Sequence, residues 1–369
     1  MIEEKNEDRQ SFDQDAVMVY IDPHLMQGLA DVAAQKAANF QELLSAAQEG
    51  DLESAYQVAL SYANGRGTSK DSELAFQWFQ RAADGDHIAA QYQLGVCFLR
   101  GIGTEADIPR GLELITSTAD QDYLPSVCEL GLCYEMGTGV EESKERAAEL
   151  YRQAAQQGDA RAQCNLGFFY YRGIGVEESD SEAVYWFSQA AEQEYPRAQF
   201  LLGECYDLGF GVEADMAHAV ELYTKAHNGG YPPATCSLGL CYELGKGVEE
   251  DKERAARLYL QSAEEEDPRA QCNLGFFYYW GIGVEKDLAQ AVLWFSRSAE
   301  QQYPRAQYLL GHCYEFGYGV EKSLEKAVAL YQAAHHRSYS DGTCALGLCY
   351  ELGTGVEQDK AKAVELYRQ

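Results

Sequence analysis

The stretch that decides the fold occupies residues 162–176 and reads Ala-Gln-Cys-Asn-Leu-Gly-Phe-Phe-Tyr-Tyr-Arg-Gly-Ile-Gly-Val. Within it, Leu166 and Tyr170 lie four residues apart, on one face of a helix. Gly173 and Gly175 follow, and a pair so close together ends a helix, because only glycine adopts positive φ without steric cost. The stretch therefore predicts a short helix closed by a tight turn.

A second helix is predicted after this turn. Ala183, Phe187 and Ala190 fall at i, i+4 and i+7, which gives an amphipathic helix with one apolar face. The small alanines let a neighbouring helix approach closely. No segment alternates with a period of two for long enough to be a strand, so we predict an all-α fold.

The leucine of the first helix recurs every 36 residues without insertion or deletion, and a glycine follows it each time. The recurring leucines are Leu94, Leu130, Leu166, Leu202, Leu238, Leu274, Leu310 and Leu346. Prolines lie 36 residues apart where the first helix should begin, at Pro196, Pro232, Pro268 and Pro304. A strict period of this kind indicates a repeat array, in which hairpins bury their apolar faces by stacking. We predict a solenoid of about nine helical hairpins over residues 54–369.

The repeated unit resembles the Sel1-like repeat, a relative of the tetratricopeptide repeat. The resemblance rests on residues 162–176, followed by Ala183, the Trp186-Phe187 pair and the Ala190-Ala191 pair. It covers roughly residues 54–369. The resemblance implies a right-handed α-α superhelix whose first helices line the concave side, and a role as an adaptor or scaffold.

The two ends of the chain differ from the repeats. Residues 1–22 are polar and acidic, and we expect a disordered tail. Residues 23–53 resemble a lone second helix, and we expect them to cap the open end of the array. At the other end, residues 365–369 match 149–153, where the earlier copy continues. We therefore expect a truncated last repeat, and a monomer or weak end-to-end association through its uncapped helix.

A longer period lies over the short one. The segment 164–171 returns unchanged as 272–279, 108 residues later. One interpretation is a recent duplication of three repeats together. The other is that a ligand engages equivalent steps along the array, which alanine substitution of Tyr171 and Tyr279 would test. Both interpretations remain open from the sequence.

The net charge of −30 bears on the partner, because such a field repels nucleic acid and anionic membrane surfaces. Many acids follow the glycine turn, as at Glu141, Glu142, Glu177 and Glu178. They suit the start of the second helix, and they could also steer a basic partner. The first residues contain no apolar core of a secretory signal, and no apolar stretch is long enough to span a bilayer, so we expect a cytoplasmic protein.

The eleven cysteines occupy only two positions of the first helix. Cys128 and Cys133, for example, differ by about 140° around the helix axis. Equivalent cysteines of adjacent repeats would lie about 8–10 Å apart, beyond disulfide reach. We therefore expect small buried thiols in a reducing compartment. Some secreted Sel1-like proteins have disulfide-bonded repeats, but here the second helices carry no cysteine.

Signals of chemistry are weak. The Cys-x4-Cys spacing has no second pair to complete a metal site, and we expect no metal or cofactor. Ser323 and Lys326 match the Ser-x-x-Lys of penicillin-interacting enzymes, without the accompanying motifs. Serine at this place also suits a helix N-cap, which is the interpretation we favour. We predict no enzyme; the alternative is a cell-wall or β-lactam-related protein of the cysteine-rich Sel1-like type.

The predicted function is binding of a partner protein or peptide in the groove formed by successive first helices. Aromatic residues would act as anchors, and acids would select a basic or polar ligand. Phe168 and Phe276 could equally pack between adjacent helices. The candidate residues are Asn165, Phe168, Tyr171, Arg172, Glu204, Asp207, Asn273, Phe276, Tyr279, Trp280, His312 and Glu315.

Overall fold

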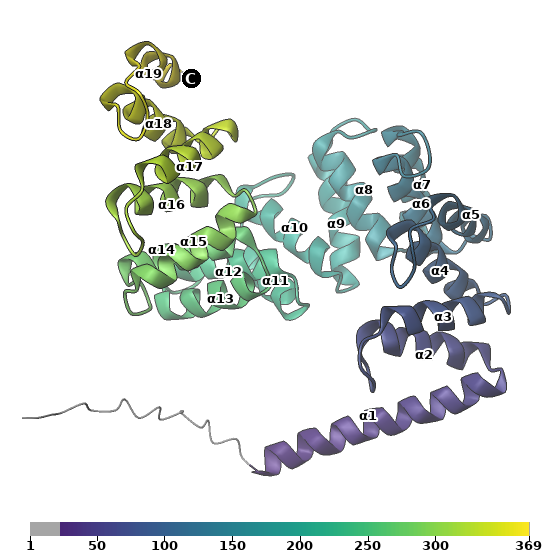
Figure 1. Cartoon of the computed structure of the whole chain (residues 1–369). Coiled ribbons are helices and arrows are strands. Elements are labelled where there is room, and N and C mark those ends of the chain that lie inside the picture. Colours follow the sequence, from purple (N-terminus) through teal and green to yellow (C-terminus); the bar gives the residue numbers. More distant parts are fainter. Residues whose placement is uncertain (1–22, 369) are drawn as a thin grey trace, which may run out of the picture. The chain divides into compact units, whose positions relative to one another are not determined.

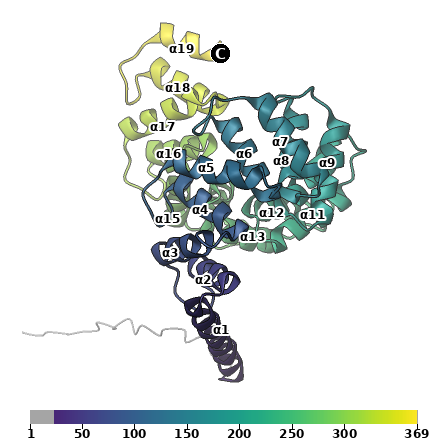
Figure 2. The ribbon, with the colours of Figure 1, turned by 90° about the vertical axis from the view of Figure 1, so that its right-hand side faces the viewer.

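The computed structural model describes the backbone of residues 23–368 and the side chains from residue 35 onward. The described residues form 19 α-helices and no strand, which confirms the predicted all-α fold. They belong to two compact units, which divide the chain between Ser126 and Val127. Inside each unit, consecutive helices run side by side as antiparallel pairs (Figures 1 and 2). The predicted acidic tail, residues 1–22, lies outside the described residues.

Each repeat supplies two helices, which we call helix A and helix B. The A helices are α2 (Leu52–Asn64), α4 (Ile88–Arg100), α6 (Leu124–Met136), α8 (Ala160–Arg172), α10 (Pro196–Leu208), α12 (Pro232–Leu244), α14 (Pro268–Trp280), α16 (Pro304–Phe316) and α18 (Ser340–Leu352). The B helices are α3 (Ser72–Ala83), α5 (Ile108–Ala119), α7 (Lys144–Gln156), α9 (Asp180–Glu192), α11 (Met216–Asn228), α13 (Lys252–Glu264), α15 (Leu288–Glu300), α17 (Leu324–His336) and α19 (Lys360–Tyr367). The four prolines of the sequence motif are the first residues of α10, α12, α14 and α16, as predicted.

The two turn glycines are required for different reasons. Gly173 ends α8 with φ of 62°, and its N–H donates to the carbonyl of Phe169. Gly175 also has positive φ, and a Cβ there would lie 2.4 Å from the carbonyl of Lys144 in the preceding helix B. The first glycine therefore turns the chain, and the second lets it touch the neighbouring repeat.

The glycine after each leucine holds helix A against helix B. A Cβ on Gly167 would lie 2.7 Å from the Phe187 ring, and one on Gly275 would lie 2.7 Å from the Phe295 ring. Both phenylalanines are almost fully buried. A larger side chain at Gly167 or Gly275 would have to displace the phenylalanine ring that it meets.

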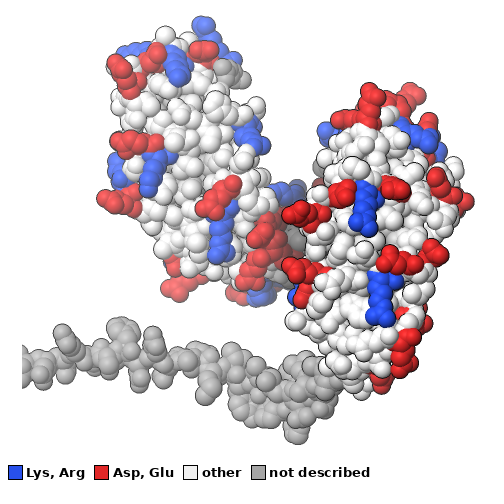
Figure 3. Space-filling view, turned by 45° about the vertical axis from the view of Figure 1, so that its right-hand side comes forward, with Lys and Arg blue, Asp and Glu red and all other residues white. Residues whose placement is uncertain are grey.

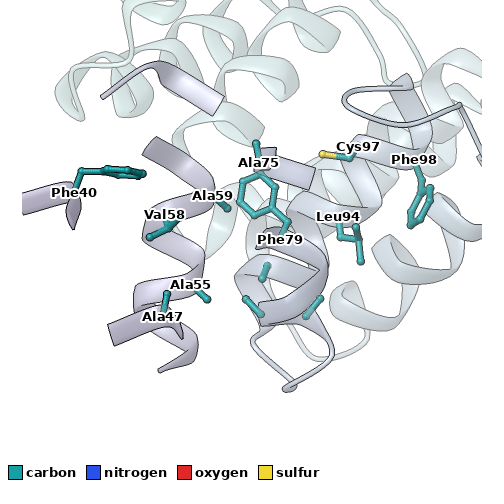
Figure 4. Packing of buried hydrophobic residues seen from close by; sticks show 13 residues of the cluster. Phe40, Ala47, Ala55, Val58, Ala59, Ala75, Phe79, Leu94, Cys97 and Phe98 are labelled. Carbon is teal, nitrogen blue, oxygen red and sulfur yellow. The ribbon is translucent and has the colours of Figure 1, made fainter. Parts of the chain in front are cut away.

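In the first unit, α1 (Pro23–Glu49) packs against α2. Phe40 and Ala47 of α1 are buried, and the Phe40 ring meets the Tyr62 ring edge-on at 5.3 Å. Figure 4 shows Phe40 pointing towards α2, with Val58 and Phe79 deeper in the same cluster. A capping role for residues 23–53 stays a proposal, which this packing supports.

All eleven cysteines are free thiols, and ten are buried. Burial raises the pKa of Cys164 and of Cys272 to about 12. Cys344 differs from the expectation because it is exposed. Its counterpart Cys128 is covered by Arg161 of the next helix A, whereas α18 is the last helix A of the described residues.

Candidate partner-binding surface

An exposed, largely apolar row follows the C-terminal ends of the A helices in the second unit. It consists of the residue just before the first turn glycine and the residue four positions earlier, which share one helix face. Met136 is 65% exposed, Leu208 62% and Leu352 63%, although all three are large and apolar. We call this row the A-helix stripe. Its members are Leu132, Met136, Phe168, Arg172, Glu204, Leu208, Leu240, Leu244, Phe276, Trp280, His312, Phe316, Leu348 and Leu352.

Arginines of the next repeat brace the N-terminal side of the stripe. The Arg197 guanidinium donates to Asn165 Oδ1 at 2.8 Å and lies 5.6 Å from the centre of the Phe168 ring. Arg305 repeats both contacts 108 residues later, at 2.9 Å to Asn273 and 5.3 Å to the Phe276 ring. Asn165, Phe168 and their counterparts, which were predicted to contact a ligand, therefore hold adjacent A helices together. Both phenylalanines are only partly buried.

Most acids near the ends of the A helices are engaged inside their own hairpin. The Tyr331 hydroxyl donates to Glu315 at 2.6 Å, and the Tyr223 hydroxyl donates to Asp207 at 3.3 Å. Burial and the neighbouring carboxylate raise the pKa of Tyr331 far above its ordinary value. The same pair occurs between Tyr151 and Glu135, Tyr259 and Glu243, and Tyr367 and Glu351. Asp207 and Glu315, predicted as ligand-selecting acids, thus already accept hydrogen bonds within the fold.

In two hairpins of the second unit, other residues take the place of the tyrosine–acid pair. Helix B carries Phe187 or Phe295 in place of the tyrosine, and helix A carries Tyr171 or Tyr279 in place of the acid. Within the described part of the chain, neither of these two tyrosine hydroxyls hydrogen-bonds to another residue. Each ring instead meets an aromatic ring in the next glycine turn.

We call these two contacts the aromatic notches. In the first notch, Tyr171 meets Phe210 edge-on, with ring centres 5.8 Å apart. In the second notch, Tyr279 meets Tyr318 in the same way at 5.9 Å. The exposed Phe316 ring stacks on the Tyr318 ring, with centres 5.8 Å apart, and Leu208 holds the equivalent exposed position just before the turn of the first notch.

The second notch lies in a larger aromatic cluster on α14 and α16. Trp280, 58% exposed, lies 5.1 Å from Tyr279 between ring centres and 6.3 Å from Phe276. His312 lies 4.6 Å from Phe316 and 5.9 Å from Tyr318. Burial lowers the pKa of His312, so its imidazole is neutral at pH 7. The structure therefore brings four of the predicted site residues into one cluster.

The first notch has a more polar border. Glu204 is part of the stripe and partly buried, and this burial raises its pKa although Arg269 opposes the shift. Arg172 is exposed beside it. Burial, followed by the charges of Glu204 and Asp180, raises the pKa of the Tyr171 hydroxyl, and Arg172 opposes the shift.

Sequence reasoning missed part of this surface. Met136, Leu208, Leu244, Phe316 and Leu352 were absent from the candidate residues. The signal was present, because each is an apolar residue directly before a turn glycine at the 36-residue period. The candidate residues also lacked Phe210 and Tyr318, which lie between the two turn glycines.

The remaining sequence signals have structural roles. Ser323 is the N-cap of α17, and its Oγ accepts a hydrogen bond from the Lys326 N–H, which confirms the N-cap prediction. The Lys326 ammonium lies 5.0 Å from the centre of the Tyr314 ring. In the described residues, no three His, Cys, Asp or Glu side chains are grouped to hold a metal ion. No described helix combines the length and the apolar composition that crossing a membrane requires.

Comparison with known proteins gives consistent matches. A sequence model named Sel1 repeat matches nine segments, residues 52–87, 88–123, 125–159, 160–195, 196–231, 232–267, 268–303, 304–334 and 340–369. The chain is similar to the crystal structure of c5321, a protective antigen of uropathogenic Escherichia coli with an SLR fold, at 28% identity and a TM-score of 0.54, covering 89% of this chain and 78% of that one. It is also similar to a Sel1 repeat protein from Oxalobacter formigenes, at 31% identity and a TM-score of 0.54, covering 79% of this chain and 84% of that one. Comparison with curated protein sequences gives no match.

Proposed function

Because the chain belongs to the Sel1 repeat family, we propose that it is a non-catalytic scaffold or adaptor that binds a segment of a partner protein along the A-helix stripe. The observation that carries the proposal is the run of large, exposed apolar side chains at one repeating position. Leu208, Leu244 and Trp280 are each about half exposed or more, although burying them would be favourable. Contiguous exposed apolar surface is typical of interaction sites.

The composition of the stripe also supports a protein ligand. Aromatic residues and methionine are enriched in the cores of protein interfaces, and lysine is depleted. Trp280, Phe316 and Met136 are of the enriched kinds, and no lysine lies in the stripe. Arg197 and Arg305 connect adjacent A helices next to the stripe, so a partner would meet a preformed surface.

The charge supports a protein partner over a nucleic acid. The net charge of −30 opposes binding to phosphate backbones and anionic membranes. We also propose a cytoplasmic location, which the eleven free thiols support, since disulfides form in oxidising compartments. The N-terminal residues 23–53 would cap the array in this proposal.

Quantitative affinity capture from cells that express the protein would test the function. The stripe variant combines Leu208→Ser, Leu244→Ser and Trp280→Ala. The control variant combines Tyr185→Ser and Leu293→Ser, because these residues are also large, apolar and exposed but lie on B helices. We expect partners to be lost from the stripe variant and retained by the control.

Partners that bind wild type and stripe variant equally would contradict the proposal. Labelling by a fluorescent penicillin tests the alternative of a cell-wall or β-lactam-related protein. Stable labelling that disappears in Ser323→Ala would favour that alternative.

A further inference from the structure

We propose that the partner segment is cationic: it presents two arginine or lysine side chains, set among apolar residues, to the two aromatic notches formed by Tyr171 with Phe210 and by Tyr279 with Tyr318. The inference rests on the proposed function, and it adds the chemistry of the ligand and the two places that recognise it. Both notches lie in the second unit, three repeats apart.

The notches are built by coordinated differences between repeats. In the second unit, five hairpins pair a helix B tyrosine with a helix A acid. The other two hairpins change both partners together, to Phe187 with Tyr171 and to Phe295 with Tyr279. The residue between the turn glycines is aromatic only in the repeats that follow these two, at Phe210 and Tyr318. Three linked differences, found twice, place a tyrosine without a hydrogen-bond partner against an aromatic turn.

The chain already uses cations to cover rings of the same surface. Arg197 covers Phe168, and Arg305 covers Phe276, both at cation–π distance. One helical turn further along the same A helices stand Tyr171 and Tyr279. Among the described contacts, no lysine or arginine lies over either of these rings. A cation from the partner would extend the pattern that the fold itself shows.

Each notch suits a cation for its own reason. At the first notch, the Glu204 carboxylate is partly buried, and Arg269 only partly opposes the effect of this burial on its pKa. Burial, and after it the charges of Glu204 and Asp180, raises the pKa of Tyr171. A partly buried carboxylate gains from a cationic partner. Arg172 is the one basic residue of the stripe here, and it is exposed.

At the second notch, rings replace the carboxylate. Trp280, Phe316 and the neutral imidazole of His312 surround the Tyr279–Tyr318 contact. Tryptophan gives the strongest cation–π attraction of the aromatic side chains. Because His312 carries no charge at pH 7, it does not repel a cation.

The net charge of the chain favours the same ligand. On the face shown in Figure 3, Lys and Arg side chains stand singly among Asp and Glu side chains, with uncharged surface between them. The chain has 59 acidic residues against 29 basic ones. A basic segment is therefore attracted to this protein at long range, and an acidic one is repelled.

The test uses a phage library of random 16-residue peptides, selected on the full chain. We expect enriched peptides to carry arginine or lysine among apolar residues. The strongest peptide is then synthesised twice, once with arginine and once with citrulline, its neutral isostere, and both are titrated by fluorescence anisotropy. The citrulline peptide should bind about tenfold more weakly or worse, and 0.5 M salt should weaken the arginine peptide alone.

Variants of the notches test the sites. Tyr171→Ala and Tyr279→Ala should each weaken the arginine peptide by about 3- to 30-fold, the range of one cation–π contact, and the double variant should lose about the product. Tyr171→Phe and Tyr279→Phe keep the rings and should bind within about twofold of wild type, which separates recognition from misfolding. Tyr185→Ala is the control on helix B.

Enriched peptides that are neutral or acidic, or equal affinity for the citrulline peptide, would overturn the inference and leave the proposed function standing. If the double variant binds the arginine peptide as tightly as the single variant with the larger loss of affinity, the claim of two notches is overturned. Peptides that bind independently of the whole stripe would instead count against the proposed function.

Discussion

The Tyr259–Glu243 pair allows a sharp test of how the repeats are stabilised. Tyr259 is fully buried, and its hydroxyl donates to a Glu243 carboxylate oxygen at 2.6 Å. Tyr259→Phe removes the donor and leaves the ring. Glu243 is only partly buried, so water can restore some of the lost hydrogen bonding.

The expected cost follows from that geometry. A hydrogen bond to a charged group contributes about 1.5–3 kcal/mol, and partial access to water places Tyr259→Phe near the lower end, about 1.5 kcal/mol. Repeat arrays need not unfold in one step, so amide hydrogen exchange is the appropriate measurement. A loss of about 1.5 kcal/mol corresponds to exchange roughly tenfold faster, and we expect this in α12 and α13.

A second substitution tests the pairing between positions. Adding Glu243→Tyr to Tyr259→Phe reproduces the combination that the chain itself uses at Tyr279 and Phe295. We expect the double variant to recover at least half of the lost protection, whereas Tyr185→Phe, on the surface, should change nothing. Exchange within twofold of wild type in Tyr259→Phe would refute the importance of the hydrogen bond. A double variant less protected than the single one would refute the pairing rule.

Three further outcomes are expected. Arg161→Ala should lower the protection of α6 and α8 against amide hydrogen exchange by about 3 kcal/mol, because it removes the guanidinium that lies 2.9 Å from the buried Glu129 carboxylate; adding Glu129→Leu should restore part of the protection, and no restoration would count against this cause. Stability should fall above about pH 9, because burial raises the pKa of Cys164 and Cys272 from 9.0 to about 12. Between these two pH values only the unfolded chain releases the thiol protons, which favours unfolding. Urea titrations at pH 8 and 10 should show a smaller fall in stability for the variant that combines Cys164→Ala and Cys272→Ala than for wild type. Trp280→Ala should change thermal stability by no more than about 0.5 kcal/mol while it weakens partner binding, because the side chain is 58% exposed; a larger loss of stability would assign the residue to the fold.

The sequence was sufficient to predict the fold because its signals are local. A proline at the first turn and glycines at the turn act through the backbone of their own segment, and both were found where expected. The period then extends each local prediction to every repeat. The role of Gly167 was not predicted, since it depends on Phe187, which lies 20 residues away on the other helix.

The candidate site was harder to predict for the same reason. Asn165, Asp207 and Glu315 lie on the expected A helices, but their partners are 16 or 32 residues away. Periodicity of one helix cannot show that a carboxylate is already hydrogen-bonded. Reading two columns of the repeat together could have shown it, because tyrosine on helix B accompanies an acid on helix A five times in the second unit.

The comparison of the two notches bears on whether the 108-residue period is functional. Residues that brace the A helices are the same in both copies, namely Asn165, Phe168 and Arg197 against Asn273, Phe276 and Arg305. Residues of the stripe that border the notches differ, with Arg172 and Glu204 replaced by Trp280 and His312.

Duplication alone accounts for the identical residues that connect the A helices. It does not account for the change from charged neighbours at Tyr171 to aromatic neighbours at Tyr279, while the tyrosine itself is unchanged. Both borders attract cations, one through a carboxylate and the other through rings. The two affinities should therefore respond differently to salt: 0.5 M salt should weaken binding at the first notch more than at the second. Titration of the arginine peptide against Tyr171→Ala and Tyr279→Ala at low and high salt would measure this, and equal salt dependence in both variants would contradict the assignment of different borders.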